Sequence, residues 1–173
     1  MRLPVILTVL FFLFLPFQTI AGSDVRVNGR TFTPDMGRQM GQAYGFVTTI
    51  HGIILYTTDN CSRWVPSYRE QFQISKDKWV ERNAYYVQLS AKIYLDLLTV
   101  VSKSSGKSQE EVNRVYSPMV TRAVSQFKST LGAKDIQTRN KFCVNFITRL
   151  NAGAMDVTAN GAVAAFMKTY KSL

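Results

Sequence analysis

The amino-acid sequence predicts an all-α protein: an up-and-down four-helix bundle with a short extra C-terminal helix, cross-linked by one disulfide. Apolar residues recur at helical spacing over long segments, and no long alternating strand pattern competes with them. The connections between these segments are short, which favours antiparallel neighbours. The chain also has one pair of cysteines, Cys61 and Cys143, behind a leader typical of exported proteins.

Residues 1–21 have the pattern of a signal peptide. Arg2 supplies a positive start, an apolar run follows from Leu3 to Ile20, and small residues come at Ala21-Gly22-Ser23. A retained membrane anchor is the alternative, because the apolar run is close to the shortest helix that can span a bilayer. Cleavage after Ala21 would leave 152 of the 173 residues and, since only Arg2 is lost, would lower the net charge from +10 to +9.

The remaining length suits one domain with a single core. Residues 22–33 are polar and contain Gly29, so we expect a flexible, extended N-terminal arm. Residues 34–173 then form the single helical-bundle domain.

The first helix is expected to begin at Pro34, with Thr33 as its N-cap and Asp35 in its first turn. Glycines recur every fourth residue along it, and each costs about 1 kcal/mol of helix propensity relative to alanine. We therefore expect another backbone to pack closely against this glycine face. The glycines are Gly37, Gly41 and Gly45, with Gly52 further on.

The polar run from Thr57 to Cys61 predicts that a turn ends this first helix.

The longest predicted helix contains residues 76–101. Its first residue follows either Pro66 or Ser75. One apolar row steps by four and three residues and keeps one side apolar for about seven turns. A second row at seven-residue intervals widens the stripe. The first row is Val80, Ala84, Val87, Ala91, Tyr94, Leu98 and Val101, and the second is Trp79, Tyr86, Ile93 and Val100.

Two polar residues, Asn83 and Ser90, interrupt the second row. They could lie at the edge of the stripe in water, or join a buried polar network with Arg82 or Asn140. The edge position is the more common arrangement, and we take it as the expectation.

Clear end signals define the third helix. A turn is centred on Gly106, and Ser108 with Glu111 matches a capping box. The helix should end at Gly132, and Pro118 should kink it because its nitrogen cannot donate to the preceding turn.

A fourth helix is predicted over residues 134–155 and a short terminal one over residues 162–170. The fourth helix should place Cys143 on its apolar face, where it can meet Cys61. The inward residues expected beside that cysteine are Ile136, Ile147 and Leu150, with Phe142 and Phe146 alongside.

The cysteine pair predicts a structural disulfide. Such a bridge between Cys61 and Cys143 would close a loop of about eighty residues and typically stabilises by about 2–4 kcal/mol. Neither cysteine has the C-x-x-C spacing of a redox site or the neighbouring histidines of a zinc site.

The sequence offers no catalytic constellation. His51 is the sole histidine, with no acid or cysteine at ligand spacing, and a packed or partly exposed side chain is its simplest interpretation. G-x-S-x-G, H-E-x-x-H, the P-loop and the EF-hand pattern are absent from the chain. Glu110 and Glu111 are better explained by capping than by paired-carboxylate catalysis. We therefore assign no catalytic, cofactor-binding or metal-binding residue.

The strongest candidate for an interaction surface is the segment containing Arg63, Trp64, Tyr68 and Arg69. Tryptophan, tyrosine and arginine dominate interface hot spots, and a disulfide at Cys61 would hold the segment rigid. The alternative is that Trp64 and Tyr68 only cover one end of the bundle.

In outline, an exported helical domain with one distant cysteine pair is similar to the periplasmic immunity proteins that neutralise secreted toxins. We expect an exported, periplasmic or secreted, non-enzymatic binding protein of the bacterial cell envelope. It would act by protein–protein contact, as an inhibitor, immunity or accessory factor, on an envelope protein that could be acidic. A small cationic hydrolase of envelope polymers and a binder of anionic membrane surfaces are the alternatives. Nucleic acid is not an expected partner, because export separates the chain from most of it.

Overall fold

The computed structural model describes residues 23–171, and the predicted signal peptide lies outside them. The described chain is mostly helical and contains one disulfide, as the sequence predicts. A short β-hairpin precedes the helices, and two 3₁₀ turns connect some of them. The elements are β1 (Val25–Val27), β2 (Arg30–Phe32), α2 (Pro34–Trp64), η3 (Pro66–Tyr68), α3 (Arg69–Ser105), α4 (Gln109–Gly132), α5 (Ile136–Asn151), η4 (Val157–Ala159) and α6 (Gly161–Lys171).

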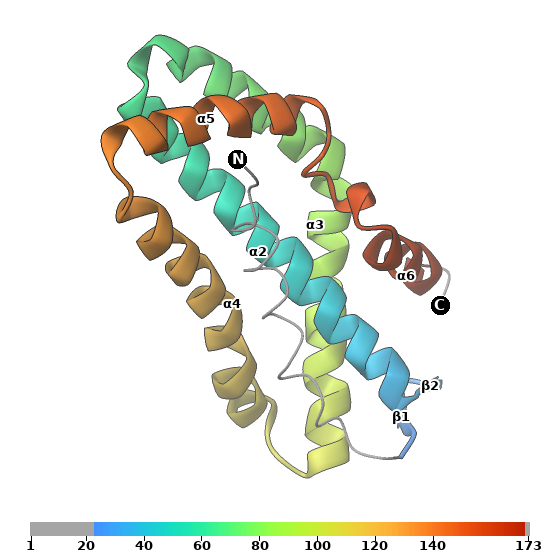
Figure 1. Cartoon of the computed structure of the whole chain (residues 1–173). Helices are drawn as coiled ribbons and strands as arrows, with labels where there is room; N and C mark the ends of the chain where they lie inside the picture. Colours follow the sequence, from blue (N-terminus) through green and yellow to red (C-terminus); the bar gives the residue numbers. More distant parts are fainter. Residues whose placement is uncertain (1–22, 172–173) are drawn as a thin grey trace.

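Helix α2 is at the centre of the arrangement, because it contacts α3, α4, α5 and α6. Helices α2 and α3 lie side by side and run in opposite directions, and α4 returns alongside them (Figure 1). Helix α5 crosses the end where α2 passes into α3, while α6 packs beside the middle of the pair. Within residues 23–171, no helix is both long and apolar enough to span a bilayer.

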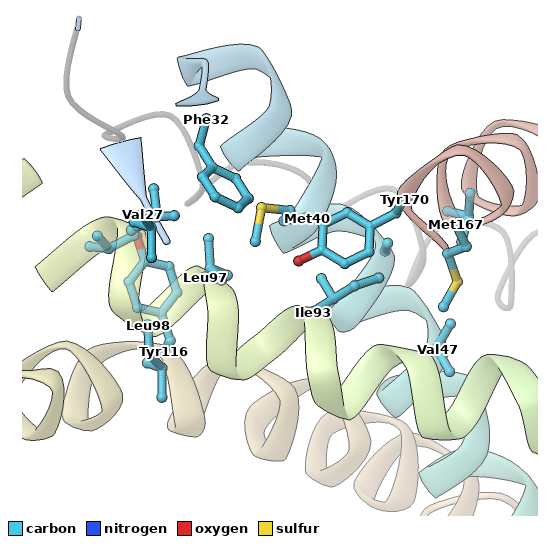
Figure 2. Packing of buried hydrophobic residues seen from close by; sticks show 14 of the residues in the cluster. Val27, Phe32, Met40, Val47, Ile93, Leu97, Leu98, Tyr116, Met167 and Tyr170 are labelled. Atoms are coloured by element: carbon cyan, nitrogen blue, oxygen red, sulfur yellow. The ribbon is translucent and has the colours of Figure 1, made fainter. Parts of the chain in front are cut away.

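The largest hydrophobic cluster lies where α2, α3 and α6 meet (Figure 2). Met40 and Val47 of α2 point toward Ile93 of α3 and toward Met167 and Tyr170 of α6. The hydroxyl of Tyr170 also donates a hydrogen bond to Asp96 of α3. This contact and burial explain why the short terminal helix folds against the bundle, since a helix of this length has little stability alone.

Residues 25–32 form an antiparallel hairpin, which differs from the extended arm expected from the sequence. Asn28 and Gly29 both have positive φ, the conformation that tight two-residue turns require. Val27 and Phe32 are buried in the large cluster. The hairpin therefore closes one end of the core.

The predicted turn after the first helix is wrong, because α2 continues without interruption to Trp64. Polar side chains in its last turns bond back to carbonyls four residues earlier: Asn60 Nδ2 donates to Tyr56 O (2.9 Å) and Ser62 Oγ to Thr58 O (2.7 Å). An exposed Asp59–Arg63 pair adds the i, i+4 attraction that supports helices. The helix thus persists through residues of low propensity.

The buried face of α3 is centred on the second predicted row rather than the first. Trp79 and Ile93 are fully buried, whereas Val80 of the first row is 38% exposed. The expectation that Asn83 and Ser90 lie in water is also wrong: both are buried, and Ser90 Oγ donates to Val87 O (2.8 Å).

The ends of α4 and α5 follow their capping residues. Ser108 and Glu111 form the predicted reciprocal capping box of α4. Asp135 caps α5 by accepting from the backbone N–H of Thr138 at 2.8 Å. Ile136, the first residue of α5, was expected to point inward but is 69% exposed. Cys143, Ile147 and Leu150 are buried as predicted.

Helices α2 and α4 approach closely at Gly52. A Cβ atom at this position would lie 3.0 Å from Cγ2 of Val124 on α4. At Gly52 the close neighbour is thus the side chain of Val124 and not the second backbone that we expected. Gly37, Gly41 and Gly45 are also buried.

Candidate functional site

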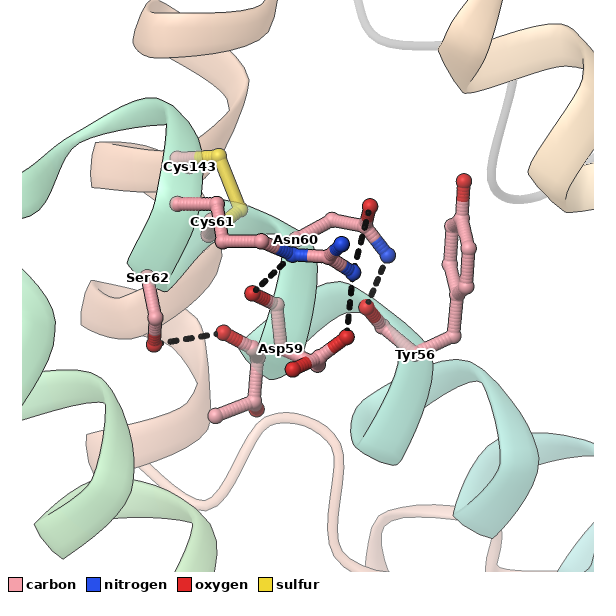
Figure 3. The surroundings of a disulfide bond; sticks show 8 residues. Tyr56, Asp59, Asn60, Cys61, Ser62 and Cys143 are labelled. Carbon is pink, nitrogen blue, oxygen red and sulfur yellow. Dashed lines mark hydrogen bonds and ion pairs between the residues drawn. A yellow bond between two sulfur atoms is a disulfide. The ribbon is translucent and has the colours of Figure 1, made fainter.

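The disulfide joins the last turns of α2 to the first half of α5 (Figure 3). The Cα atoms of Cys61 and Cys143 are 5.5 Å apart, a normal distance for a disulfide. Both side chains are fully buried among the apolar residues that the two helices share. The end of α2 and the middle of α5, which are 82 residues apart in sequence, are thereby fixed to one another.

A cation–π contact lies beside this bridge. The guanidinium carbon of Arg139 is 4.8 Å from the centroid of the Trp64 ring. Trp64 comes three residues after Cys61, and Arg139 four residues before Cys143, so each partner is one helical turn from a bridged cysteine. The disulfide therefore holds the two turns that carry the contact.

A second cation–π contact lies on the neighbouring side of α2. The Lys128 ammonium of α4 is 5.0 Å from the centroid of the Tyr56 ring. Tyr56, Trp64 and Phe142 all pack against the small cluster of Ile53, Phe127 and Leu131. The two cations thus lie over one continuous aromatic and aliphatic group built from α2, α4 and α5. We call Tyr56, Trp64, Lys128 and Arg139 the aromatic–cationic corner.

The predicted interaction segment is distributed around this corner. Arg63 is exposed and paired with Asp59, and the exposed Arg69 has its Nε 3.5 Å from Ser62 O. Trp64 is half-buried under Arg139. Tyr68 is half-buried and contacts Phe72, so it covers the end of the bundle. The structure brings Trp64 together with groups from α4 and α5 rather than exposing all four predicted side chains on one surface.

Positive charge is concentrated in the C-terminal part of the chain. Residues 112–171 contain nine Lys and Arg but only Asp135 and Asp156, a net charge of +7, against +9 for the whole chain after Ala21. Asp156 is paired with Arg82, and Asp135 caps α5. In the described part of the chain, neither Lys128 nor Arg139 has an acidic partner.

A separate polar network fixes the connection between α5 and α6 to α3. Arg82 donates to both carboxylate oxygens of Asp156 (2.9 and 3.0 Å). Asn83 Nδ2 donates to the same carboxylate (3.1 Å), and Asn83 Oδ1 accepts from the Val157 backbone N–H at 2.8 Å. Trp79 Nε1 donates to Met155 O at 2.9 Å. Every polar atom named here has its partner inside the chain, which is the pattern of a structural network.

His51 stacks on Trp79, with ring centroids 5.7 Å apart. Burial lowers the pKa of the imidazole below its ordinary value of 6.5, because desolvation disfavours the charged form. Within residues 23–171, no group of three or more His, Cys, Asp or Glu side chains is arranged to hold a metal ion.

Sequence reasoning missed Tyr56, Lys128 and Arg139. The available signal was the cysteine pair itself: residues one helical turn from Cys61 and Cys143 must lie near one another once the bridge forms. In comparisons with known proteins, no protein family, curated protein or solved structure matches the chain significantly.

Proposed function

We propose that this protein is an exported, non-enzymatic binding protein of the bacterial cell envelope that acts by protein–protein contact, as an inhibitor, immunity or accessory factor. The observation that carries the proposal is the position of the disulfide beside Trp64 and Arg139, between α2 and α5. Tryptophan and arginine are the residue types that contribute most at protein interfaces. Two helices cross-linked in this way lose little conformational entropy when they bind a partner.

The scaffold supports this role. The leader pattern and the disulfide are compatible with maturation in an oxidising compartment such as the periplasm. We infer an up-and-down bundle in which α2, α3 and α4 alternate in direction and α5 lies across one end. In such an arrangement the surface that α5 offers to a partner protein is a helix rather than a loop.

Affinity capture from a native envelope extract tests the proposal. The mature protein, with its disulfide intact, is immobilised beside the same protein after reduction and alkylation of both cysteines. We expect one envelope protein to be retained by the disulfide-bonded form in stoichiometric amount and to be lost from the reduced form. The proposal is overturned if no protein is retained, or if the purified protein itself degrades envelope polymers in a zymogram.

A further inference from the structure

We propose that the aromatic–cationic corner is the docking surface for an acidic segment of a partner protein. This inference rests on the proposed function and adds to it the place of contact and the chemistry of the partner. The corner consists of Tyr56 and Trp64 of α2, Lys128 of α4 and Arg139 of α5.

Charge complementarity identifies the partner as acidic. Some exposed cations of the chain are neutralised by a nearby carboxylate, as in the Asp35–Arg38 and Asp59–Arg63 pairs of α2. Lys128 and Arg139 are among the cations that have no carboxylate partner within residues 23–171, and each of them also lies over an aromatic ring. An unneutralised pair of cations in the most positive part of the chain favours an anionic partner.

The geometry of Arg139 leaves its outer nitrogens free for that partner. Its Nε is buried and has no hydrogen-bond acceptor in the described structure, whereas its two Nη groups are not buried and donate to no residue there. The N–H groups of a guanidinium lie in its own plane, where a carboxylate can accept two of them. The contact with Trp64 holds the guanidinium in place while its outer nitrogens stay available to a carboxylate.

Apolar groups beside the cations favour a protein over a lipid surface or a charged polymer. Ile136, on the same turn of α5 as Arg139, is 69% exposed. The faces of Tyr56 and Trp64 are already covered by cations, so they are not free to enter a bilayer. Two isolated cations beside a large apolar side chain do not form the continuous charged track that a polyanion requires. They resemble the mixture of arginine, aromatic and aliphatic groups found at protein interfaces.

The disulfide pre-organises the corner. It fixes the turn after Cys61 against the turn before Cys143, so Arg139 does not have to be ordered when the partner binds. A lower entropic cost of ordering means tighter binding for the same contacts.

Titration of the folded protein with two synthetic peptides tests the proposal. One peptide contains glutamates around a central leucine, and the other replaces each glutamate with glutamine. We expect only the acidic peptide to bind at physiological salt, with NMR amide shifts confined to the turns around residues 56–64 and 128–139. Lys128→Gln combined with Arg139→Gln should weaken binding by about tenfold or more, since charge-assisted hydrogen bonds are lost. Arg139→Lys should weaken it less, because it keeps the charge but not the bidentate geometry.

A matched control separates this site from general electrostatic attraction. Lys78→Gln combined with Lys103→Gln removes the same charge from two exposed lysines of α3 that have no acidic partner in the described chain. This variant should bind the peptide within about twofold of the native protein. Each variant is first checked for an intact disulfide and native circular dichroism.

Several outcomes overturn the proposal. One is an equal loss of peptide affinity in both double variants, and another is a set of NMR amide shifts spread over the whole surface. The third is a protein that does not bind the acidic peptide but binds vesicles with about one third anionic lipid through the aromatic–cationic corner. The envelope capture experiment distinguishes the two levels of inference. If the protein with Lys128→Gln and Arg139→Gln still retains the partner fully, the corner is not the docking surface, while the proposed function stands. If no partner is retained but the acidic peptide binds at the corner, the proposed function fails and the assignment of the corner survives.

Discussion

The guanidinium of Arg139 lies over the Trp64 ring, 4.8 Å from its centroid, next to the disulfide that joins α2 to α5. A covalent bond and a cation–π contact thus fasten the same two helix turns. Trp64 ends α2 and Arg139 stands near the start of α5, so the contact adds to the buried cluster and the disulfide that hold α5 against α2.

Replacement of Arg139 by glutamine should lower the free energy of unfolding by about 0.5–1 kcal/mol, the usual strength of a partly exposed cation–π contact. Urea denaturation of the disulfide-bonded protein measures the change. Arg149→Gln on the same helix is the control, since Arg149 is exposed and should change stability by less than about 0.5 kcal/mol. Equal effects of the two substitutions would show that the Trp64 contact contributes nothing.

Gly52→Ala should destabilise the protein although alanine is the better helix former. The added methyl would meet Val124 Cγ2 at 3.0 Å, and a β-branched side chain in a helix cannot easily rotate away. We expect this overpacking, typically about 1–3 kcal/mol, to exceed the gain of about 1 kcal/mol in propensity. Thermal unfolding gives the sign directly.

Gly132→Ala is the matched control for that substitution, because a Cβ there meets nothing within 4 Å. It should stabilise or be neutral. Combining Gly52→Ala with Val124→Ala should recover part of the loss, and a Gly52→Ala protein as stable as Gly132→Ala would disprove close packing at this crossing.

Asn83→Ala should cost about 1–3 kcal/mol, because the backbone N–H of Val157 would be buried without its acceptor. The Arg82–Asp156 pair would also lose the amide that donates to the same carboxylate. Arg38→Ala, which breaks only an exposed pair with Asp35, should cost less than about 1 kcal/mol. Comparable losses in the two variants, measured by urea denaturation, would mean that Asn83 is not part of a buried network.

His51 should make the protein less stable in mild acid. Burial lowers the pKa of His51 in the folded state below 6.5, so the unfolded chain binds the proton more strongly. The contribution of His51 to stability is therefore complete above about pH 6.5 and declines as the pH falls below that value. His51→Gln should show a smaller loss of unfolding free energy between pH 7.5 and 5.5 than the native protein. Identical losses would mean that the imidazole is freely solvated.

The helices themselves could be predicted because their signals are local. Thr33, Ser108 and Glu111 define helix starts through side-chain contacts within one turn, and each does so in the structure. The facing of Cys143 toward Cys61 followed from periodicity and the even cysteine count.

The sequence could not predict which distant residues form hydrogen bonds with each buried polar side chain. Asn83 looked like a break in an apolar row, but it is buried because Asp156 and Val157, more than seventy residues away, complete its hydrogen bonds. The face of α3 was misjudged for the same reason, since a periodicity argument counts only apolar residues. The turn expected at Thr57 was absent because Asn60 and Ser62 bond back within the helix.

The corner could not be found from spacing alone. Trp64 and Arg139 are distant in sequence, and they meet where the disulfide and the surrounding apolar cluster join α2 to α5. A surface assembled from three helices has no contiguous motif. The linear segment from Arg63 to Arg69 contained one of its four members.

Peptide mapping by mass spectrometry, on the protein recovered from the exported fraction without reduction, tests the central claim most directly. Export through a cleaved leader, followed by sulfur cross-linking of α2 to α5, predicts an N-terminus at Gly22 and one linked peptide that contains both Cys61 and Cys143. An uncleaved N-terminus together with two free thiols would contradict it.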